Sequence, residues 1–176
     1  MSRIFIPPTA LTPWSLESVG AKLSGMGFPI SGAASAVYPS ANLAIYVPFY
    51  LLTPCTVAQV FWYNGATQTD SVDFGIYSAD GRQLLHTGAI ALSGANALQT
   101  VDVTDTQIGE GLNWMAIAQN GTTGALFAVA LANIGLTCLT GIYQQGTAYT
   151  LPATATFADP TFDYIPVMGF TPRSVV

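Results

Sequence analysis

The stretch VDFGIYSADGRQLLHT, residues 72–87, decides the fold. Its first half, Val72 to Ser78, is rich in the β-branched and aromatic residues that favour strands. Its second half, Arg82 to Thr87, follows Ala79-Asp80-Gly81, a sequence typical of a tight turn. Two strand-like runs joined by so short a turn predict an antiparallel hairpin.

Strand-like runs continue on both sides of this hairpin. Thr56 to Tyr63 (TVAQVFWY) is β-branched and aromatic, and it stops at Asn64-Gly65, a strong tight-turn signal. Leu43 to Leu52 alternates two faces, one of them strongly apolar, while Pro48 indicates an edge strand or a bulge. Turns rich in Gly, Asn and Thr separate the further runs, which are Leu98 to Val103, Leu112 to Gln119, Ala125 to Ala132, Leu136 to Tyr143 and Tyr164 to Phe170.

About eight short strands at this spacing, with almost no helix, predict an all-β fold. We expect an antiparallel β-sandwich, most simply a jelly roll, flanked by extended N- and C-terminal arms. Residues 38–150 are the predicted sandwich domain. Residues 1–37 are predicted as an extended arm followed by a loop of small residues. Residues 151–176 contain four prolines and are predicted as a C-terminal extended segment with room for one last strand.

Charge is scarce: the 176 residues include four Lys and Arg and nine Asp and Glu, for a net charge of −5. Mean hydropathy is +0.46. A monomer of this mass exposes on the order of 8,000 Å², which leaves roughly 600 Å² per charge against about 200 Å² in an ordinary soluble domain. Lipid or other protein subunits are therefore expected to cover part of the exterior.

Protein is the expected cover. The longest uninterrupted apolar run, Leu43 to Leu52, is about half of the roughly twenty residues that a spanning helix needs. Pro7 and Pro8 interrupt the N-terminus before the apolar core of a signal peptide can form, so no membrane partner and no cleaved signal are expected. No Lys or Arg occurs between Gln83 and Pro172, which excludes a basic face for nucleic acid.

The residues that carry enzyme chemistry are few. The one histidine, His86, lies on a hairpin strand, and the sequence contains no nucleophile elbow, phosphate-binding loop or zinc spacing. Cys55 and Cys138 are too few and too distant for a disulfide scaffold and are expected to be small buried side chains. We therefore expect no enzyme and no cofactor.

The sequence offers candidates for two kinds of ligand site. Asp102, Asp105 and Glu110 carry oxygens of the kind that calcium prefers, but strand-end turns also favour Asp for its backbone hydrogen bonds. Trp62 and Tyr63 are candidates for stacking against a sugar ring, with a core position as the alternative.

The N-terminal arm has its own character. Its prolines make it extended and unable to pair well with itself, while its other residues are apolar. Such a segment is expected to lie on a partner. The predicted partner-binding residues of the two arms are Ile4, Phe5, Ile6, Leu11, Trp14 and Arg173.

Several motifs between residues 38 and 120 occur together, and their order resembles that of small jelly-roll virion proteins of tailed bacteriophages. They are Tyr38-Pro39-Ser40-Ala41-Asn42-Leu43-Ala44-Ile45-Tyr46-Val47-Pro48-Phe49, Trp62-Tyr63-Asn64-Gly65-Ala66, Val72-Asp73-Phe74-Gly75-Ile76-Tyr77, Asp80-Gly81, and Val101-Asp102-Val103-Thr104-Asp105-Thr106 before Gly111-Leu112.

The resemblance implies a structural component of a phage particle, assembled in the bacterial cytoplasm, without cofactor or catalytic residues. Because the chain is short and lacks a shaft, we expect a capsid decoration or cement protein. It would form a homotrimer and clamp the major capsid protein or other virion proteins through its arms. The alternative is a tail fibre or receptor-binding jelly-roll protein, and a module that binds a host glycan is a third hypothesis.

Overall fold

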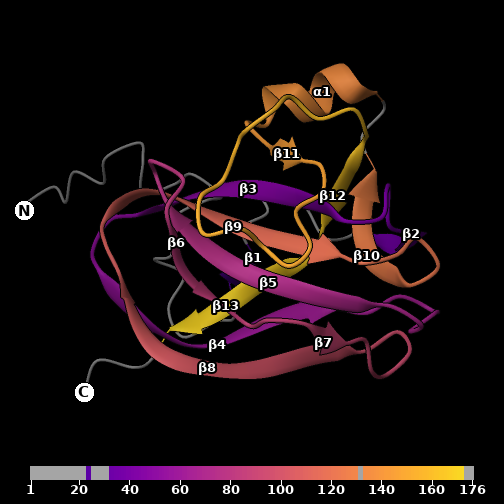
Figure 1. Cartoon of the computed structure of the whole chain (residues 1–176), viewed down its shortest axis with the longest axis horizontal. Coiled ribbons are helices and arrows are strands. Elements are labelled where there is room, and N and C mark those ends of the chain that lie inside the picture. Colours follow the sequence, from indigo (N-terminus) through magenta and orange to yellow (C-terminus); the bar gives the residue numbers. More distant parts are fainter. Residues whose placement is uncertain (1–22, 25–31, 131–132, 173–176) are drawn as a thin grey trace, which may run out of the picture.

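The computed structural model describes residues 23–24, 32–130 and 133–172, which form an all-β sandwich (Figure 1). Its named strand pairs are antiparallel. The six-stranded sheet contains, in spatial order, β11 (Tyr143–Gln145), β3 (Leu43–Leu51), β9 (Gly111–Gln119), β5 (Ser71–Ser78) and β6 (Gln83–His86), with β7 (Ile90–Ala91) also paired to β5.

Two smaller sheets complete the sandwich. The four-stranded sheet has the order β1 (Leu23–Ser24), β13 (Met168–Pro172), β4 (Cys55–Tyr63) and β8 (Leu98–Ile108). The three-stranded sheet has the order β12 (Tyr164–Pro166), β10 (Ala125–Ala130) and β2 (Ala34–Val37). The predicted all-β, antiparallel sandwich is confirmed.

The hairpin of residues 72–87 is present as β5 and β6. Ile76 lies opposite Leu85, and the Gly81 N–H donates to the Ser78 carbonyl at 2.9 Å to close the turn. Gly81 has a φ of 81°, in the left-handed region that glycine adopts without steric cost. Local turn chemistry therefore sets this hairpin as the sequence predicts.

The two smaller sheets are joined through Val167, the residue between β12 and β13. Its N–H donates to the Phe127 carbonyl at 2.8 Å, and its own carbonyl accepts from the Tyr63 N–H at 3.0 Å. These bonds connect β10 in one sheet with β4 in the other. Residues 164–172 are thus integral to the sandwich and supply two strands, more than the C-terminal segment was expected to contribute.

Two short strands precede residue 38, in the region predicted as arm and loop. β1 pairs with β13, and β2 pairs with β10. The small side chains of Ala34–Val37 give no strand periodicity, so the backbone pairing with β10 is what makes this segment a strand. The sandwich therefore begins N-terminal to the predicted boundary.

The predicted strand Leu136 to Tyr143 is wrong over most of its length. Ile134–Leu139 forms α1, and β11 begins at Tyr143. Gly141, with a φ of 75°, follows the helix, and its N–H donates to the Cys138 carbonyl at 3.1 Å. A glycine at this position ends helices, and a short apolar run alone does not distinguish helix from strand.

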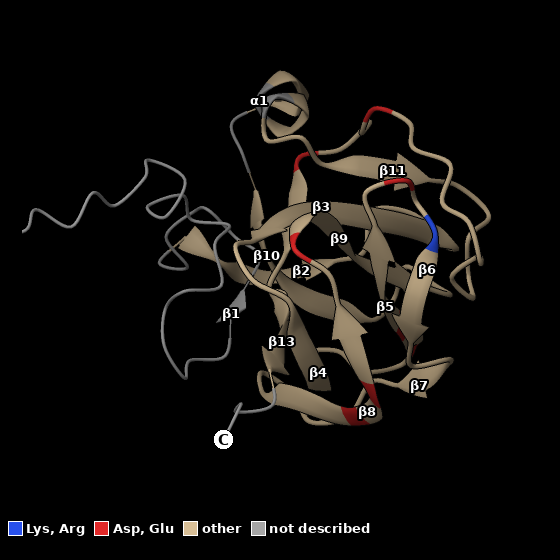
Figure 2. Cartoon of the chain, turned by 90° about the vertical axis from the view of Figure 1, so that its left-hand side faces the viewer, with Lys and Arg blue, Asp and Glu red and all other residues tan. Residues whose placement is uncertain are grey.

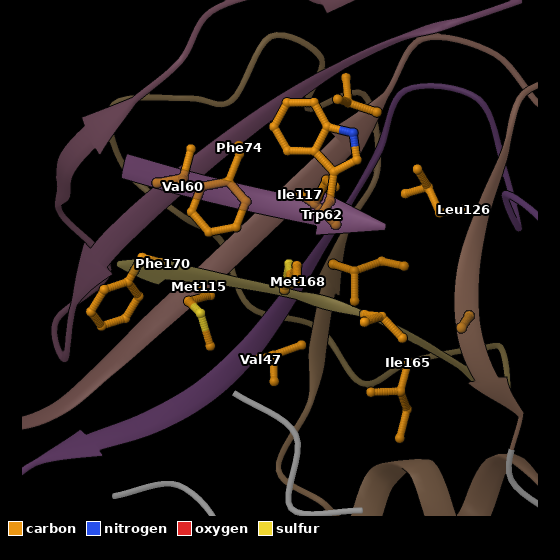
Figure 3. Close-up of a cluster of buried hydrophobic side chains, with 14 of the residues drawn as sticks. Val47, Val60, Trp62, Phe74, Met115, Ile117, Leu126, Ile165, Met168 and Phe170 are labelled. Carbon is orange, nitrogen blue, oxygen red and sulfur yellow. The ribbon is translucent and has the colours of Figure 1, made fainter. Parts of the chain in front are cut away.

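The main core lies between the six-stranded sheet and the two smaller sheets (Figure 3). Alternate residues of the six-stranded sheet point into it, among them Val47, Phe74 and Met115. Trp62 and Phe170 meet them from β4 and β13. Burying side chains of this size contributes roughly 1.5–3 kcal/mol each before ordering costs, so this core is the main source of stability.

A second apolar cluster covers the other face of the six-stranded sheet. Ala44, Tyr46, Trp114 and Ala116 occupy the alternate positions of β3 and β9 and are buried there. They are covered by residues 146–158, which we call the covering segment. Its Phe157 ring lies 5.2 Å from Tyr46 and 4.8 Å from Trp114, centroid to centroid.

Hydrogen bonds hold the covering segment on the sheet. The buried Asp73 carboxylate accepts from the Leu151 N–H at 2.9 Å, and the Tyr77 hydroxyl donates to the Pro152 carbonyl at 2.7 Å. A Cβ on Gly75 would lie 2.9 Å from Leu151 Cδ1 and 3.0 Å from the Leu85 carbonyl oxygen, so the segment packs closely over this glycine. The chain therefore covers this apolar face by itself.

Candidate interaction surface

A groove of about 450 Å³ opens where β2, β10 and β12 meet. Small side chains make up much of its lining, including Ala34, Ala36, Ala128 and Ala130. Phe162 and Tyr164 supply its aromatic part, and Asp163 is the charged residue among the described residues that line it. The groove is therefore mainly apolar with a carboxylate on its border.

The strand register explains why the groove is apolar. Ala34 lies opposite Ala128, and Ala36 lies opposite Leu126, so these side chains share one face of the three-stranded sheet. Leu126 is fully buried in the main core, which shows that this is the inward face. Ala34 and Ala130 on the same face are nevertheless exposed. The groove is thus an extension of the core that the described residues leave uncovered.

β2 also offers a free strand edge. Among the described residues it pairs with β10 alone, and it contains neither a charge nor a proline. Val37 at its end is 62% exposed, the largest exposure among the described large apolar side chains. An edge strand of this kind presents unpaired N–H and C=O groups, to which an extended segment can add.

The described residues are strongly acidic. Eight of them are Asp or Glu, and Arg82 is their one Lys or Arg, so the body in Figure 2 is almost without blue. Their formal charge is therefore −7. The residues outside the described ranges contain Arg3, Lys22, Arg173 and Glu17, for a formal charge of +2.

The one histidine takes part in a structural pair. His86 Nδ1 lies 3.2 Å from the Asp73 Oδ2 atom, and the Thr87 hydroxyl donates to Asp73 Oδ1 at 3.2 Å. The same Oδ2 accepts from the backbone of the covering segment. Asp73 is fully buried, and its oxygens are engaged in holding three parts of the chain together. His86 is thus part of the hydrogen-bonded network around Asp73.

The calcium candidates do not come together. Asp102 Oδ1 accepts from Gln59 Nε2 at 2.6 Å across the paired strands β8 and β4. Asp105 lies where the register of these strands shifts, and Glu110 lines another groove. Among the residues that the structure describes, no three His, Cys, Asp or Glu side chains are placed to hold a metal ion. Asp102 and Asp105 both lie within β8 (Leu98–Ile108), so the strand-end turn expected for them is not present either.

The groove lined by Glu110 lies between the β5–β6 and β8–β9 turns and also contains Asp80 and Arg82. The Ser78 hydroxyl donates a hydrogen bond to the Asp80 carboxylate and lowers its pKa below the ordinary value. Because this groove joins opposite charges on exposed turns, it offers less apolar contact than the groove beside β2.

The two sugar-stacking candidates have different environments. Trp62 is fully buried, and its Nε1 donates to Asn64 Oδ1 at 2.9 Å. A sugar cannot reach this ring, so Trp62 is a core residue and the stacking prediction is wrong for it. Tyr63 is half-buried, packs 4.7 Å from the Phe127 ring, and donates its hydroxyl to the Asn96 carbonyl.

The remaining candidates are the arm residues and the cysteines. Ile4, Phe5, Ile6, Leu11, Trp14 and Arg173 lie outside the described residues. Both cysteines are free thiols: Cys138 is exposed, contrary to expectation, and Cys55 is half-buried, where burial raises its pKa.

Comparisons with known proteins give no relative: no protein family matches the chain, and no curated protein matches it. No helix among the described residues is long and apolar enough to cross a membrane.

The groove beside β2 was not predicted from the sequence. Gly32, Ala34 and Ala36 belong to a stretch of small residues that was interpreted as loop without a packing face. Small residues at alternate positions leave the space that forms the groove. That spacing was the available signal, but it has meaning only once β2 is paired with β10.

Proposed function

We propose that this chain is a non-enzymatic structural protein of a phage virion, a jelly-roll capsid decoration or cement protein that stabilises the shell through subunit contacts. The observation that carries the proposal is the apolar groove beside the edge strand β2, which the described residues leave open. A monomer in water gains nothing from leaving an extension of its core open, whereas a subunit that meets neighbours needs such a surface.

The distribution of polar groups supports the same proposal. The buried carboxylate of Asp73 and the buried amide of Asn64, which donates to Ser93 and Gln99, hold segments of the chain together. Acidic side chains on the exterior stand on strands and turns rather than around a common centre. The residues thus serve the fold and its surface, as in a structural protein.

The resemblance of residues 38–120 to small jelly-roll virion proteins supplies the phage setting. The alternative, a tail fibre or receptor-binding protein, has the same resemblance behind it. Its glycan-binding form has lost its best residue, because Trp62 is inside the core. The decoration role is therefore preferred, and the position of the protein on the particle distinguishes the two.

The cementing role is tested on phage particles that carry this protein. Particles stripped of it are expected to release their genome at a lower temperature, or to lose resistance to a chelator, and re-adding the purified protein should restore both. Unchanged resistance after complete removal would exclude cementing. A density map of the particle that places the protein on the tail would support the tail fibre or receptor-binding role instead of the cementing role.

A further inference from the structure

We propose that the groove beside β2 binds residues 3–8 (RIFIPP) of a second copy of this chain. The inference rests on the proposed structural role, because it names the partner of the same surface. It follows from the direction in which the chain enters the sandwich, the chemistry of the groove and the distribution of charge.

The direction of β1 shows from which side the chain joins the sandwich. Leu23 lies opposite Phe170 and Ser24 opposite Gly169, so β1 runs antiparallel to β13 and toward β12. The residues before Leu23 therefore attach on the Pro172 side. In Figure 1, β13 runs from β12 toward the side of the molecule opposite β2. The chain therefore joins β1 from the side that faces away from the groove.

This geometry favours a neighbour as the occupant. To reach its own groove, the segment would have to reverse direction and pass back along β13 and β12. From Phe170, opposite Leu23, back to Tyr164 these strands cover about 20 Å at roughly 3.3 Å per residue. Residues 8–22 span at most about 50 Å when extended, and Pro8 and Pro13 favour extension. Continuing outward to a second copy requires no reversal.

The chemistry of the segment fits the groove. Ile4, Phe5 and Ile6 are bulky and strand-forming, and the alanines lining the groove leave space for such side chains. The backbone of these three residues can add to the free edge of β2. Pro7 and Pro8 have no N–H to donate, so this pairing would end where the prolines begin.

Charge complements the fit. The described body carries a formal charge of −7, whereas the residues outside it carry +2. Arg3 directly precedes the apolar residues of the segment, and Asp163 borders the groove that receives them. A carboxylate beside the groove therefore meets a cation on the incoming segment.

The arrangement also predicts the kind of assembly. A segment of one subunit bound in the groove of another makes a head-to-tail contact, in which the two surfaces differ. Such contacts close into rings when the rotation between neighbours permits it. The expected homotrimer is one such ring.

The test is photo-crosslinking of the full-length protein with p-benzoylphenylalanine in place of Phe5. Chains that carry p-benzoylphenylalanine at residue 5 are mixed with ¹⁵N-labelled wild-type chains before irradiation, and mass spectrometry locates the adducts. We expect adducts between residue 5 of one copy and residues 32–39, 128–130 or 162–164 of another. The same probe at Tyr50, an exposed aromatic position on β3, is the control and should not label the groove.

Variants make the test specific to the groove. Val37→Glu places a charge at the exposed end of β2 and should reduce the adduct yield at least tenfold, whereas Leu98→Glu, a matched change on β8, should leave it unchanged. Arg3→Asp should also lower the yield, and combining it with Asp163→Arg should restore it.

Three outcomes would overturn the inference: adducts confined to a single chain, adducts outside the groove, or no adducts. The first would make the chain's own segment the occupant. Because the experiment uses no phage particles, its failure leaves the virion role standing. Absence of the protein from particles would leave the docking inference standing.

Discussion

Replacing Trp62 by Phe tests whether this residue belongs to the core. The indole Nε1 donates to Asn64 Oδ1 at 2.9 Å, and both residues are fully buried. Losing the donor leaves a buried carbonyl oxygen unpaired, which costs about 1–3 kcal/mol. The smaller ring also leaves a gap of roughly 40 Å³, worth ~1 kcal/mol at about 24 cal/mol per Å³. The free energy of unfolding should therefore fall by about 2–4 kcal/mol.

Urea denaturation of the full chain measures this loss. With a slope of about 2 kcal/mol per M, the midpoint should move down by roughly 1–2 M. Tyr63→Phe is the matched control, because its hydroxyl bond to Asn96 is exposed and its ring contact with Phe127 remains. It should stay within about 0.5 kcal/mol of wild type. A Trp62→Phe protein as stable as wild type, or a larger loss of unfolding free energy for Tyr63→Phe than for Trp62→Phe, would refute the reasoning.

Three further predictions concern the six-stranded sheet and its covering segment. Asp73→Asn should lower the free energy of unfolding by about 1–3 kcal/mol and speed proteolysis of the covering segment, whereas Asp102→Asn should do neither. Equal rates of limited digestion for the two variants would contradict this prediction. Gly75→Ala places a methyl group 2.9 Å from the Leu151 side chain and should lower the free energy of unfolding by about 1–3 kcal/mol. Gly109→Ala, which has nothing within 4 Å of the new methyl group, is the control and should leave the urea midpoint unchanged. Equal urea midpoints for the two variants would argue against close packing of the covering segment on Gly75. Burial raises the pKa of Tyr77 to about 12, above the unfolded value of about 10. The contribution of the protonated Tyr77 hydroxyl to folding stability is therefore complete below pH 10 and lost between about pH 10 and 12. A melting temperature that stays constant over that range would contradict this prediction.

Parts of the fold that depend on local chemistry were predictable from the sequence. The hairpin of residues 72–87 was predictable because Gly81 permits the turn that the flanking strands require. The predicted strand Thr56 to Tyr63 lies within β4, and Leu112 to Gln119 lies within β9. In each case β-branched and aromatic residues end at a turn signal, so sequence and tertiary structure agree.

Other parts depend on distant partners and were not predictable. β2 consists of small residues whose strand conformation comes from pairing with β10. The strand-like run Tyr164 to Phe170 was predictable, whereas the position of Met168 and Phe170 in the main core was not. The groove itself exists because three strands from separate parts of the chain meet. The amino-acid composition of these strands alone does not indicate that they are neighbours in the fold.

The central claim is that this protein is a shell subunit whose surface is shared with neighbours. Cryo-electron microscopy of particles of the phage that carries this sequence tests it most directly. The account predicts the sandwich on the outer capsid at contacts between major capsid subunits, with density for a neighbour's segment in the groove beside β2. Particles that lack the protein altogether would contradict the claim.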